Sequence, residues 1–250
     1  MQNNSFSAMI CPVSGCMVIE KPPAANWATD MRCTKQSSMD SHLHHTISQA
    51  RDPAATPDSL KNLYDKWSIS YDKDFSDCYN GPKYAAEAIN KVVSDKHARI
   101  LDCGCGTGLV GEQLRAMGYD NIDGVDMSED SLQIAREKGI YSKLLAEEMG
   151  AHPMDGVQKD LYDAIICCGV FVSGHVTDVV LHEWTRVVKP GGFIVIAVNE
   201  KYIHLVKGDT FKKLMETKVI EVTDDLYLPA FVVIGDKNAS GCFVITMKIL

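Results

Sequence analysis

The glycine-rich segment LDCGCGTG, residues 101–108, is the part of the sequence best suited to chemistry. It follows the apolar segment ARILD at 98–102 and leads into GLVGEQLRAM at 108–117, which has helical spacing. A strand that passes through a glycine-rich turn into a helix brings bare backbone N–H groups close to a ligand. We therefore expect a pocket for a nucleotide-like or amino-acid-like ligand at this turn.

The spacing of the glycines separates two classes of cofactor. The nicotinamide and flavin fingerprint is GxGxxG, whereas here Leu109 occupies the third glycine position and the last glycine comes one residue earlier, at Gly108. Asp126 ends the next apolar segment, 22 residues after Gly104. A carboxylate at that place can accept hydrogen bonds from both hydroxyls of a ribose. A ribose reader is expected in either class, but Leu109 argues against a nicotinamide-dependent oxidoreductase.

Segments with strand character alternate with helical segments over the rest of the chain. We expect helices at 60–67, 82–95, 108–117, 128–138 and 175–188, and strands at 98–102, 121–126, 141–146, 162–168 and 193–198. Ser128 is placed to cap its helix, and the Lys-Pro-Gly-Gly sequence at 189–192 is expected to form a turn. Two further strand-like segments, 218–234 and 242–250, have no helix between them.

This alternation predicts an α/β fold in which right-handed crossovers build a doubly wound sheet. The expected sheet has seven strands, is mostly parallel, has helices on both faces and ends in an antiparallel hairpin. The continuous apolar runs IICC and FIVIAV fit central strands that are buried on both faces.

Residues 1–57 carry no apolar period, and we expect a poorly ordered N-terminal tail followed by one domain at 58–250. The tail contains residues of zinc-ligand type, but their spacing does not match the close pairs of compact zinc modules. Zinc therefore remains the minor alternative, and no metal site is expected. The residues of that alternative are Cys11, Cys16, Cys33, His42, His44 and His45.

Four motifs in order, LDCGCGTG, GVDMS, YDAIICCGV and RVVKPGG, resemble those of the class I S-adenosylmethionine-dependent methyltransferases. The resemblance covers residues 60–250 and implies a Rossmann-like methyltransferase fold with S-adenosylmethionine as cofactor and S-adenosylhomocysteine as product. A closer resemblance, to one methyltransferase-like protein, is carried by LYDKWSISYDKDF and by the segment from CGCGTG to KGIY.

The resemblance also implies roles for individual residues. The loop from Gly104 through Cys105 and Gly106 to Gly108 would approach the methionine and ribose parts of the cofactor, while Asp102 would hold the loop and help to bind the α-amino group. Asp126 would bind the ribose hydroxyls and Met127 would pack on the adenine. Cys168 and Gly169 would face the methionine amino group, and Tyr64 and Tyr71 would come from a covering helix. Glu147 and Glu148 are both candidates to accept a hydrogen bond from the adenine amino group. The alternative is that they are a solvated pair of charges at the start of a helix.

The methyl acceptor is less clearly indicated. The sequence CCGVFVSG lacks the Asn/Asp-Pro-Pro-Tyr-like motif with which related enzymes grip exocyclic amines, and Cys167 and Cys168 lack the proline that precedes a cytosine-C5 nucleophile. His175 is the candidate general base for a hydroxyl or thiol acceptor, with a helix-start residue as the alternative. His204 lies in the segment 199–217 that we expect to shape the acceptor pocket together with the residues before Pro82.

Composition limits the partners. Lys and Arg total 25 against 33 Asp and Glu, which gives a net charge of −8. Nucleic-acid binding is driven by clustered cations, so a nucleic-acid partner is not expected. The N-terminus lacks a secretory pattern, no segment is apolar over the length of a membrane span, and the cysteines in apolar segments fit reduced thiols. We expect a cytoplasmic protein, with the nucleus left open, that methylates a small molecule. Protein methylation and cofactor binding without turnover are the alternatives.

Overall fold

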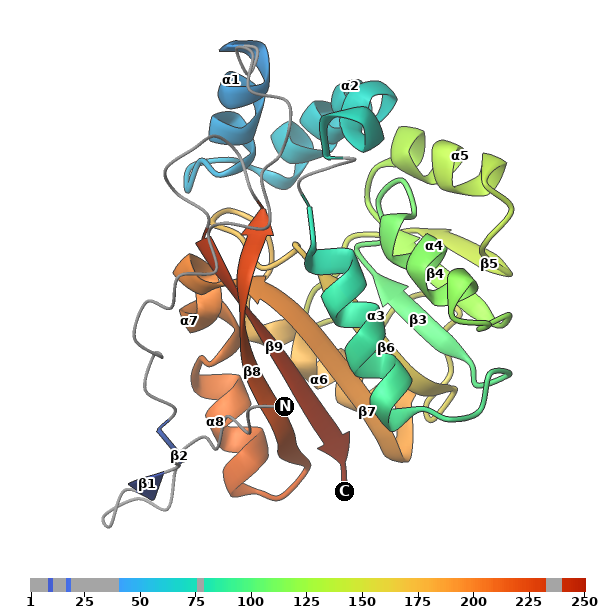
Figure 1. The fold of residues 1–250 in the computed structure, drawn as a ribbon, viewed down its shortest axis with the longest axis vertical. Helices are drawn as coiled ribbons and strands as arrows, with labels where there is room; N and C mark the ends of the chain where they lie inside the picture. The colour runs from blue at the N-terminus through green and yellow to red at the C-terminus, as the bar shows by residue number, and fades with distance from the viewer. Residues whose placement is uncertain (1–8, 11–16, 19–40, 76–78, 233–239) are drawn as a thin grey trace, which may run out of the picture. The chain divides into compact units, whose positions relative to one another are not determined.

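The computed structural model describes residues 9–10, 17–18, 41–75, 79–232 and 240–250 (Figure 1). The chain divides into two compact units, Met1–Thr34 and Lys35–Leu250. In the first unit, β1 (Met9–Ile10) pairs antiparallel with β2 (Met17–Val18). The cysteines of the zinc alternative, Cys11, Cys16 and Cys33, lie outside the described residues.

The second unit is built on a seven-stranded sheet of order β5-β4-β3-β6-β7-β9-β8. The strands β5, β4, β3, β6 and β7 are parallel to one another, and β9 joins β7 and β8 through antiparallel pairs. This arrangement confirms the predicted doubly wound sheet with its terminal hairpin. The strands are β3 (Ile100–Cys103), β4 (Ile122–Asp126), β5 (Lys143–Ala146), β6 (Tyr162–Cys168), β7 (Val188–Asn199), β8 (Ile220–Val232) and β9 (Ser240–Ile249).

Helices cover both faces of the sheet, and two more lie at the carboxyl ends of its parallel strands (Figure 1). The chain reverses its winding between β3 and β6, and such a switch point leaves a crevice at the carboxyl ends of the strands. The helices are α1 (Ser41–Ala50), α2 (Pro57–Phe75), α3 (Gly81–Val92), α4 (Leu109–Ala116), α5 (Glu129–Glu137), η1 (Asp178–Val180), α6 (Leu181–Val187), η2 (Glu200–Tyr202), α7 (Ile203–Val206) and α8 (Asp209–Glu216).

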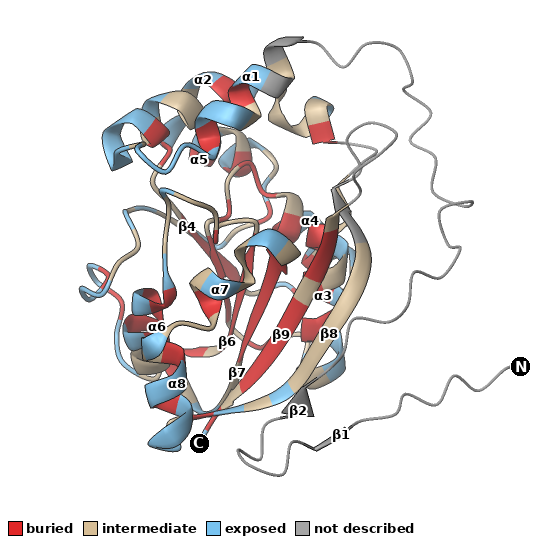
Figure 2. Cartoon of the chain, turned by 90° about the vertical axis from the view of Figure 1, so that its left-hand side faces the viewer, coloured by how far each residue is buried: buried red, intermediate tan, exposed pale blue. Residues whose placement is uncertain are grey.

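The core follows the two-residue period of the strands. Ile165 and Cys167 of β6 point into the cluster that contains Trp184 of α6 and Phe211 of α8, while the intervening Ile166 is also fully buried but lies outside that cluster. Successive side chains of a strand face opposite sides of its sheet, so β6 is covered on both faces. Figure 2 shows the same burial along β6, β7 and β9.

Two predictions about the segment from residue 175 to residue 192 need correction. The residues Lys189 to Gly192 form a bulge inside β7 instead of a separate turn, because Val188 pairs with Tyr162 and Phe193 pairs with Ala164. The predicted helix at 175–188 begins later, at Asp178, as the short η1 that leads into α6. His175 therefore lies in the loop after β6 and not at a helix start.

The structure also places a helix, α1, inside the segment 1–57 that we expected to be poorly ordered. Leu43, Ile47 and Ala50 follow one another at helical spacing and so lie on one side of α1. Ala50 is buried, and α1 packs on α2. The covering helix α2 is longer than predicted and extends from Pro57 to Phe75.

Candidate functional site

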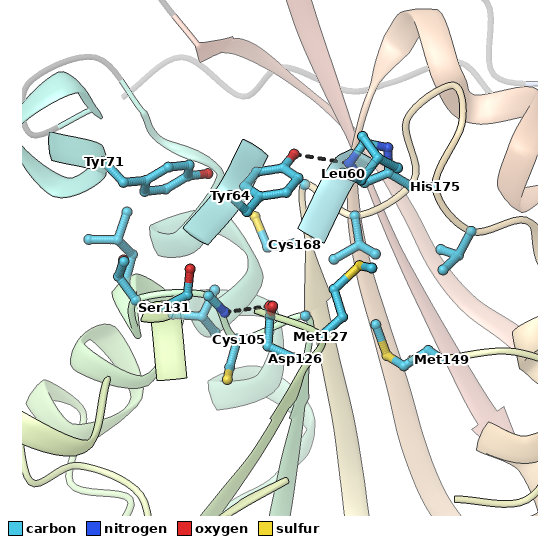
Figure 3. Close-up of a pocket in the computed structure, with 18 of the residues that line it drawn as sticks. Leu60, Tyr64, Tyr71, Cys105, Asp126, Met127, Ser131, Met149, Cys168 and His175 are labelled. Carbon is cyan, nitrogen blue, oxygen red and sulfur yellow. Dashed lines mark hydrogen bonds between the residues drawn. The ribbon is translucent and has the colours of Figure 1, made fainter. Parts of the chain in front are cut away.

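A cavity of about 1060 Å³, counting the open solvent at its mouth, lies where the carboxyl ends of β3, β4 and β6 meet α2 (Figure 3). Most of the residues that the sequence predicted for the site line this cavity. They are Tyr64, Tyr71, Gly104, Cys105, Gly106, Asp126, Met127, Glu147, Glu148, Cys168, Gly169 and His175. Asp102 and Gly108 do not line it.

The glycine loop differs from our expectation of bare backbone N–H groups. Those of Gly104 and Cys105 donate to the Val125 carbonyl at 2.8 and 3.1 Å, and that of Gly108 donates to the Cys105 carbonyl at 2.9 Å. The N–H of Gly106 donates to Asp126 Oδ2 at 2.9 Å. The loop is therefore held by its own donors, and Gly106 leaves free space beside it because it carries no side chain.

Two glycines show why the loop needs this residue type. Gly104 has φ of +73°, and a Cβ there would overlap the Val170 side chain. Gly106 has φ of +52°, and a Cβ there would meet no atom within 4 Å. Because Gly106 lines the cavity, its missing side chain leaves space for a ligand. Gly108 serves a different purpose, since it is the N-cap of α4 with φ of +99° and lies beside Tyr141.

Asp126 stands at the end of β4 with its carboxylate fixed. Oδ2 accepts from the Gly106 N–H, and Oδ1 accepts from the Ser128 N–H at 2.9 Å. Burial raises the pKa of this carboxyl, and the backbone donors at Ser128 and Gly106 oppose that rise. An ionised carboxylate has about four lone-pair sites, so each oxygen keeps capacity for a ligand hydroxyl.

Asp102 is fully buried behind the loop. Its Oδ2 accepts from the Tyr141 hydroxyl at 2.7 Å, while Oδ1 has no hydrogen-bond partner among the described residues. Burial raises the pKa of Asp102 to about 7, with the Tyr141 hydrogen bond acting in the opposite direction. The predicted contact of Asp102 with an amino group stays a prediction, and the unpartnered oxygen is the feature that such a group would satisfy.

The helix α2 is tied to the glycine loop and to α5 by polar contacts that the sequence analysis missed. The Ser128 hydroxyl donates to Asp65 Oδ1 at 2.6 Å. The Thr107 hydroxyl donates to Asp72 Oδ1 at 2.5 Å, and Lys138 Nζ lies 2.6 Å from Asp72 Oδ2. These contacts join segments far apart in sequence, so no local pattern could indicate them.

A second cavity, of about 560 Å³ counting open solvent, adjoins the first. Tyr64, Tyr71, Tyr79 and Gly169 line both cavities and therefore mark their boundary. Along α2 and just after it, neighbouring rings are in contact, with centroid separations between 4.7 and 5.9 Å, through Tyr64, Trp67, Tyr71, Phe75 and Tyr79. The first four of these rings repeat at three- and four-residue spacing, which puts them on one side of the helix.

His175 and Tyr64 point toward each other (Figure 3). The Tyr64 hydroxyl lies 3.0 Å from His175 Nε2, and His175 Nδ1 lies 3.2 Å from the Ser173 carbonyl. A carbonyl can only accept, so Nδ1 carries the proton and Nε2 accepts from Tyr64. Burial lowers the pKa of His175, so the imidazole is neutral at pH 7.

Cys167 and Cys168 are buried at the end of β6. Burial raises the pKa of the Cys168 thiol to about 12 and holds that of Cys167 well above its usual range. The Tyr79 hydroxyl lies 3.2 Å from Cys168 Sγ. Thiols in this state are protonated at neutral pH, and the thiolate is the nucleophilic form, so neither residue is an activated nucleophile. The five described cysteines are free.

The remaining candidates divide between the cavities and the surface. Glu147 and Glu148 both line the first cavity, and Glu147 accepts from the Asp155 N–H at 3.0 Å, so the choice of adenine reader stays open. His204 is exposed on α7 and lines neither cavity, whereas Asn199 and Tyr202 of the same segment line the second. Residues that the sequence analysis missed include Leu60, Tyr79, Met149 and Val170.

Among the described residues, no three His, Cys, Asp or Glu side chains come together as a metal site. Within the same ranges, no helix has the length and hydropathy needed to span a membrane.

Known proteins resemble this chain in both sequence and fold. Residues 100–192 match the family described as a methyltransferase domain. Methyltransferase-like protein 27 of Homo sapiens is 32% identical over 148 residues, which cover 57% of this chain and 60% of that protein. A ubiquinone biosynthesis O-methyltransferase of Hydrogenovibrio crunogenus is 28% identical over 155 residues, which cover 59% of this chain and 63% of that protein. The match therefore spans about three fifths of the length of each relative.

A solved structure extends the likeness to the fold. One chain of the complex between the Trm112 methyltransferase activator of Haloferax volcanii and a methyltransferase superposes with a TM-score of 0.57 at 18% identity, covering 74% of this chain and 97% of that one. The sheet order and this likeness give the chain the Rossmann-like fold of methyltransferases. Its central segment, from β3 into β7, carries the methyltransferase-domain match, which contains the glycine loop, Asp126 and His175.

Proposed function

We propose that this chain is an S-adenosylmethionine-dependent methyltransferase. The observation that carries the proposal is the orientation of the Asp126 carboxylate at the mouth of a loop whose Gly106 leaves space for a ligand. The match of residues 100–192 to a methyltransferase domain supports the same class. S-adenosylmethionine would supply a methyl group on a positively charged sulfur.

The residues around the first cavity fit the parts of that cofactor. Asp126 would accept from the ribose hydroxyls, and Met127 would pack against the adenine. Glu147 and Glu148 add acceptors on the same side. The negative charges of these three carboxylates also suit a ligand that carries a sulfonium and an ammonium group. Tyr64 and Tyr71 of α2 would cover the bound molecule.

Methyl transfer is an in-line displacement, so the protein contributes mainly by aligning donor and acceptor and by excluding water. The glycine loop and Asp126 fix one reactant, and the contacts of Asp65 and Asp72 hold α2 over it. A general base is required only where the acceptor has to lose a proton. The neutral imidazole of His175 is the described side chain of the cavity best suited to that role.

Calorimetric titration tests the cofactor. S-adenosylmethionine and S-adenosylhomocysteine should bind with one site per chain, and NAD should give no heat. The NAD result distinguishes this proposal from a nicotinamide-dependent oxidoreductase, which would bind in the same crevice. Affinity for NAD without affinity for either adenosyl compound would rule the proposal out.

We further propose that the acceptor is a small molecule. The two adjoining cavities are partly enclosed by α1 and α2, which favours a compact ligand over a polymer. The bacterial relative is named as an O-methyltransferase of ubiquinone biosynthesis, which supports an oxygen acceptor. The closer resemblance in the sequence, to the methyltransferase-like protein of the Williams–Beuren syndrome chromosomal region, stays a prediction, as does the cytoplasmic location.

A further inference from the structure

We propose that the second cavity is the acceptor site, that it takes a small planar aromatic molecule bearing a hydroxyl, and that Tyr64 passes the hydroxyl proton to His175. This inference rests on the proposed function, because the first cavity has to hold the methyl donor. It narrows the acceptor pocket, which the sequence placed in residues 199–217 and the segment before Pro82, to a defined cavity, and it adds a role for Tyr64 to the one expected of His175.

The second cavity lies directly against the cofactor cavity. It shares Tyr64, Tyr71, Tyr79 and Gly169 with the cofactor cavity, so a ligand there would meet the cofactor across this boundary. Gly169, which follows the last residue of β6, has φ of +76°, and a Cβ there would overlap the Tyr79 hydroxyl. Because Gly169 has no side chain, the two cavities are separated by little protein at this point. Transfer of a methyl group from the cofactor to an acceptor in the second cavity requires such closeness.

The lining of the second cavity indicates what it would bind. Its walls carry the rings of Trp67, Phe75 and Phe171, together with Ile47 and Val172. Aromatic walls favour flat aromatic ligands through stacked and edge-to-face contacts between rings. The ligand therefore has a planar apolar body.

The polar groups of the same cavity limit where the hydroxyl of the ligand can lie. Arg51 is exposed, and Asn199 already donates through its side-chain amide to the Ser240 hydroxyl at 2.5 Å. Tyr64, Tyr71 and Tyr79 are at the boundary with the cofactor cavity, and Tyr202 is a further tyrosine of the second cavity. The Tyr64 hydroxyl lies 3.0 Å from His175 Nε2, a base that can take a proton, and Tyr79 is in contact with Cys168.

The hydrogen bond between Tyr64 and His175 runs in the direction that proton transfer from Tyr64 to His175 needs. His175 Nε2 already accepts from the Tyr64 hydroxyl, which leaves the Tyr64 oxygen able to accept a proton from another hydroxyl. The charged groups that influence Tyr64 are Asp126 at the end of β4 and Arg51 after α1, and they act on its pKa in opposite directions. Burial lowers the pKa of His175, and the hydrogen bond from Nδ1 to the Ser173 carbonyl leaves Nε2 as the unprotonated nitrogen.

The transfer balances without any further reactant. An oxygen lone pair of the acceptor forms the new O–C bond, and the S–C bond of the donor breaks with its electron pair remaining on sulfur. The hydroxyl proton of the acceptor moves to the Tyr64 oxygen, and the proton of Tyr64 moves to His175 Nε2. The positive charge that began on sulfur thus ends on the imidazolium.

4-Nitrophenol is a suitable probe, because it is planar, carries one hydroxyl and absorbs visible light only as its anion. With the full chain saturated by S-adenosylhomocysteine, titration should show one bound 4-nitrophenol per chain. Val172→Trp should fill the cavity and weaken probe binding at least tenfold, with the affinity for S-adenosylhomocysteine unchanged. Ala50→Phe is a second filling variant on a different element, and Ala54→Phe, on the exposed turn after α1, is its matched control.

The outcomes separate the two proposals. If S-adenosylhomocysteine does not bind, the proposed function fails before the second cavity is tested. If it binds but 4-nitrophenol does not, or if both filling variants bind the probe as the unaltered chain does, the assignment of the cavity is overturned.

The relay has its own readout, which does not depend on turnover. In the unaltered chain, a larger part of the bound 4-nitrophenol should be ionised at pH 7 than in a chain without the relay, because its proton can move through Tyr64 to His175 within the complex. Tyr64→Phe and His175→Gln should each reduce this anion absorbance at least threefold while probe binding is retained. Tyr84→Phe removes a hydroxyl that donates to the Pro229 carbonyl outside both cavities and should change nothing. Equal absorbance in all four proteins would overturn the relay.

Discussion

At the scale of single residues, three acidic side chains near the glycine loop differ sharply in what they contact. Asp126 is held by two backbone donors and lines the cavity. Asp102 is buried behind the loop with one unpartnered oxygen, and Asp72 ties α2 to Thr107 and Lys138. The resemblance in the sequence implied different roles for Asp126 and Asp102, and these roles stay predictions, while the contacts of Asp72 were not indicated by the sequence.

Replacing Asp126 should weaken the binding of S-adenosylhomocysteine. Hydrogen bonds to a charged acceptor contribute about 1.5–3 kcal/mol each, so Asp126→Ala should raise the dissociation constant at least tenfold. The variant also loses the acceptor of the Gly106 N–H, which adds to the effect. Calorimetry measures the change, and thermal unfolding verifies that the variant is folded.

The matched control is Asp120→Ala, which removes an exposed carboxylate just before the amino end of the same strand. Its dissociation constant should match that of the unaltered chain. If Asp126→Ala also binds as tightly as the unaltered chain, Asp126 has no place in the cofactor site.

Asp102 should make stability depend on pH. It holds its proton up to about pH 7 in the folded chain, but only up to about pH 4 when unfolded. Between these values the folded state binds more protons, so the free energy of unfolding falls as pH rises, by at most about 1.4 kcal/mol per unit. The contribution of this group is complete below about pH 4 and lost above about pH 7.

Asp102→Asn cannot ionise, so its stability relative to the unaltered chain should rise from pH 4 to pH 7. Urea unfolding at pH 4.5 and pH 7.5 measures both proteins, and the exposed Asp155→Asn serves as the control. Parallel pH curves for Asp102→Asn and the unaltered chain would contradict the raised pKa.

At the scale of elements, the sequence predicted correctly those helices and strands that are determined by a short local pattern of residues. The strand β6 lies where it was expected, at 162–168. Ser128 caps α5, since its hydroxyl accepts from the Ser131 N–H at 3.1 Å. The signals for both are contained in fewer than a dozen residues, which is why they could be found.

What the sequence could not predict depends on contacts between distant segments. The α1 helix has only ten residues, and a helix of that length is marginal without packing partners; it is stabilised here by α2. The loop that holds His175 includes Gly174 with φ of +82°, whose Cβ would overlap the backbone near Asp52. The second cavity needs α1, α2 and the loop after β6 together, so no single stretch of sequence indicates it.

Truncation should separate the roles of these helices. A chain that starts at Lys35, the beginning of the second unit, should bind S-adenosylhomocysteine and 4-nitrophenol as the full chain does. A chain that starts at Pro57 should keep the cofactor but lose the probe, because it lacks the Ile47, Ala50 and Arg51 walls. A chain that starts at Gly81 lacks Tyr64 and Tyr71 and should lose both ligands.

Calorimetry on the three truncated chains gives this comparison directly, with circular dichroism to verify that each is folded. Retained probe binding after the start at Pro57 would show that α1 is not part of the acceptor site. Lost cofactor affinity after the start at Lys35 would show that residues 1–34 belong to the functional domain.

The zinc alternative for the N-terminal segment is tested by metal analysis of the full chain. We expect no stoichiometric zinc, because Cys11, Cys16, Cys33 and the histidines at 42–45 lack the paired spacing of compact zinc modules. The chain that starts at Lys35 is the matched comparison. One zinc per full chain that disappears on this truncation would instead show a folded metal module.

At the scale of the whole molecule, the net charge and the two cavities favour the same kind of methyl acceptor. The net charge of −8 opposes any sequence-independent attraction to nucleic acid. The two cavities meet at one boundary beneath α1 and α2. Three tyrosine rings and one glycine form this boundary, and no charged side chain lines both cavities among the described residues. A compact uncharged acceptor is compatible with both features, whereas a polyanion is compatible with neither.

The last prediction follows from this combination and concerns the acceptor itself. The chain should show no affinity for DNA or RNA that weakens with salt, since such affinity requires the release of counterions by clustered Lys and Arg. Incubation of a cell extract with methyl-labelled S-adenosylmethionine should give a labelled product that passes a membrane retaining macromolecules. Val172→Trp, which fills the second cavity, should abolish that product, and Ala54→Phe should not. Label found only in protein or nucleic acid would overturn the small-molecule proposal, and no label at all in spite of cofactor binding would favour a regulatory protein without turnover.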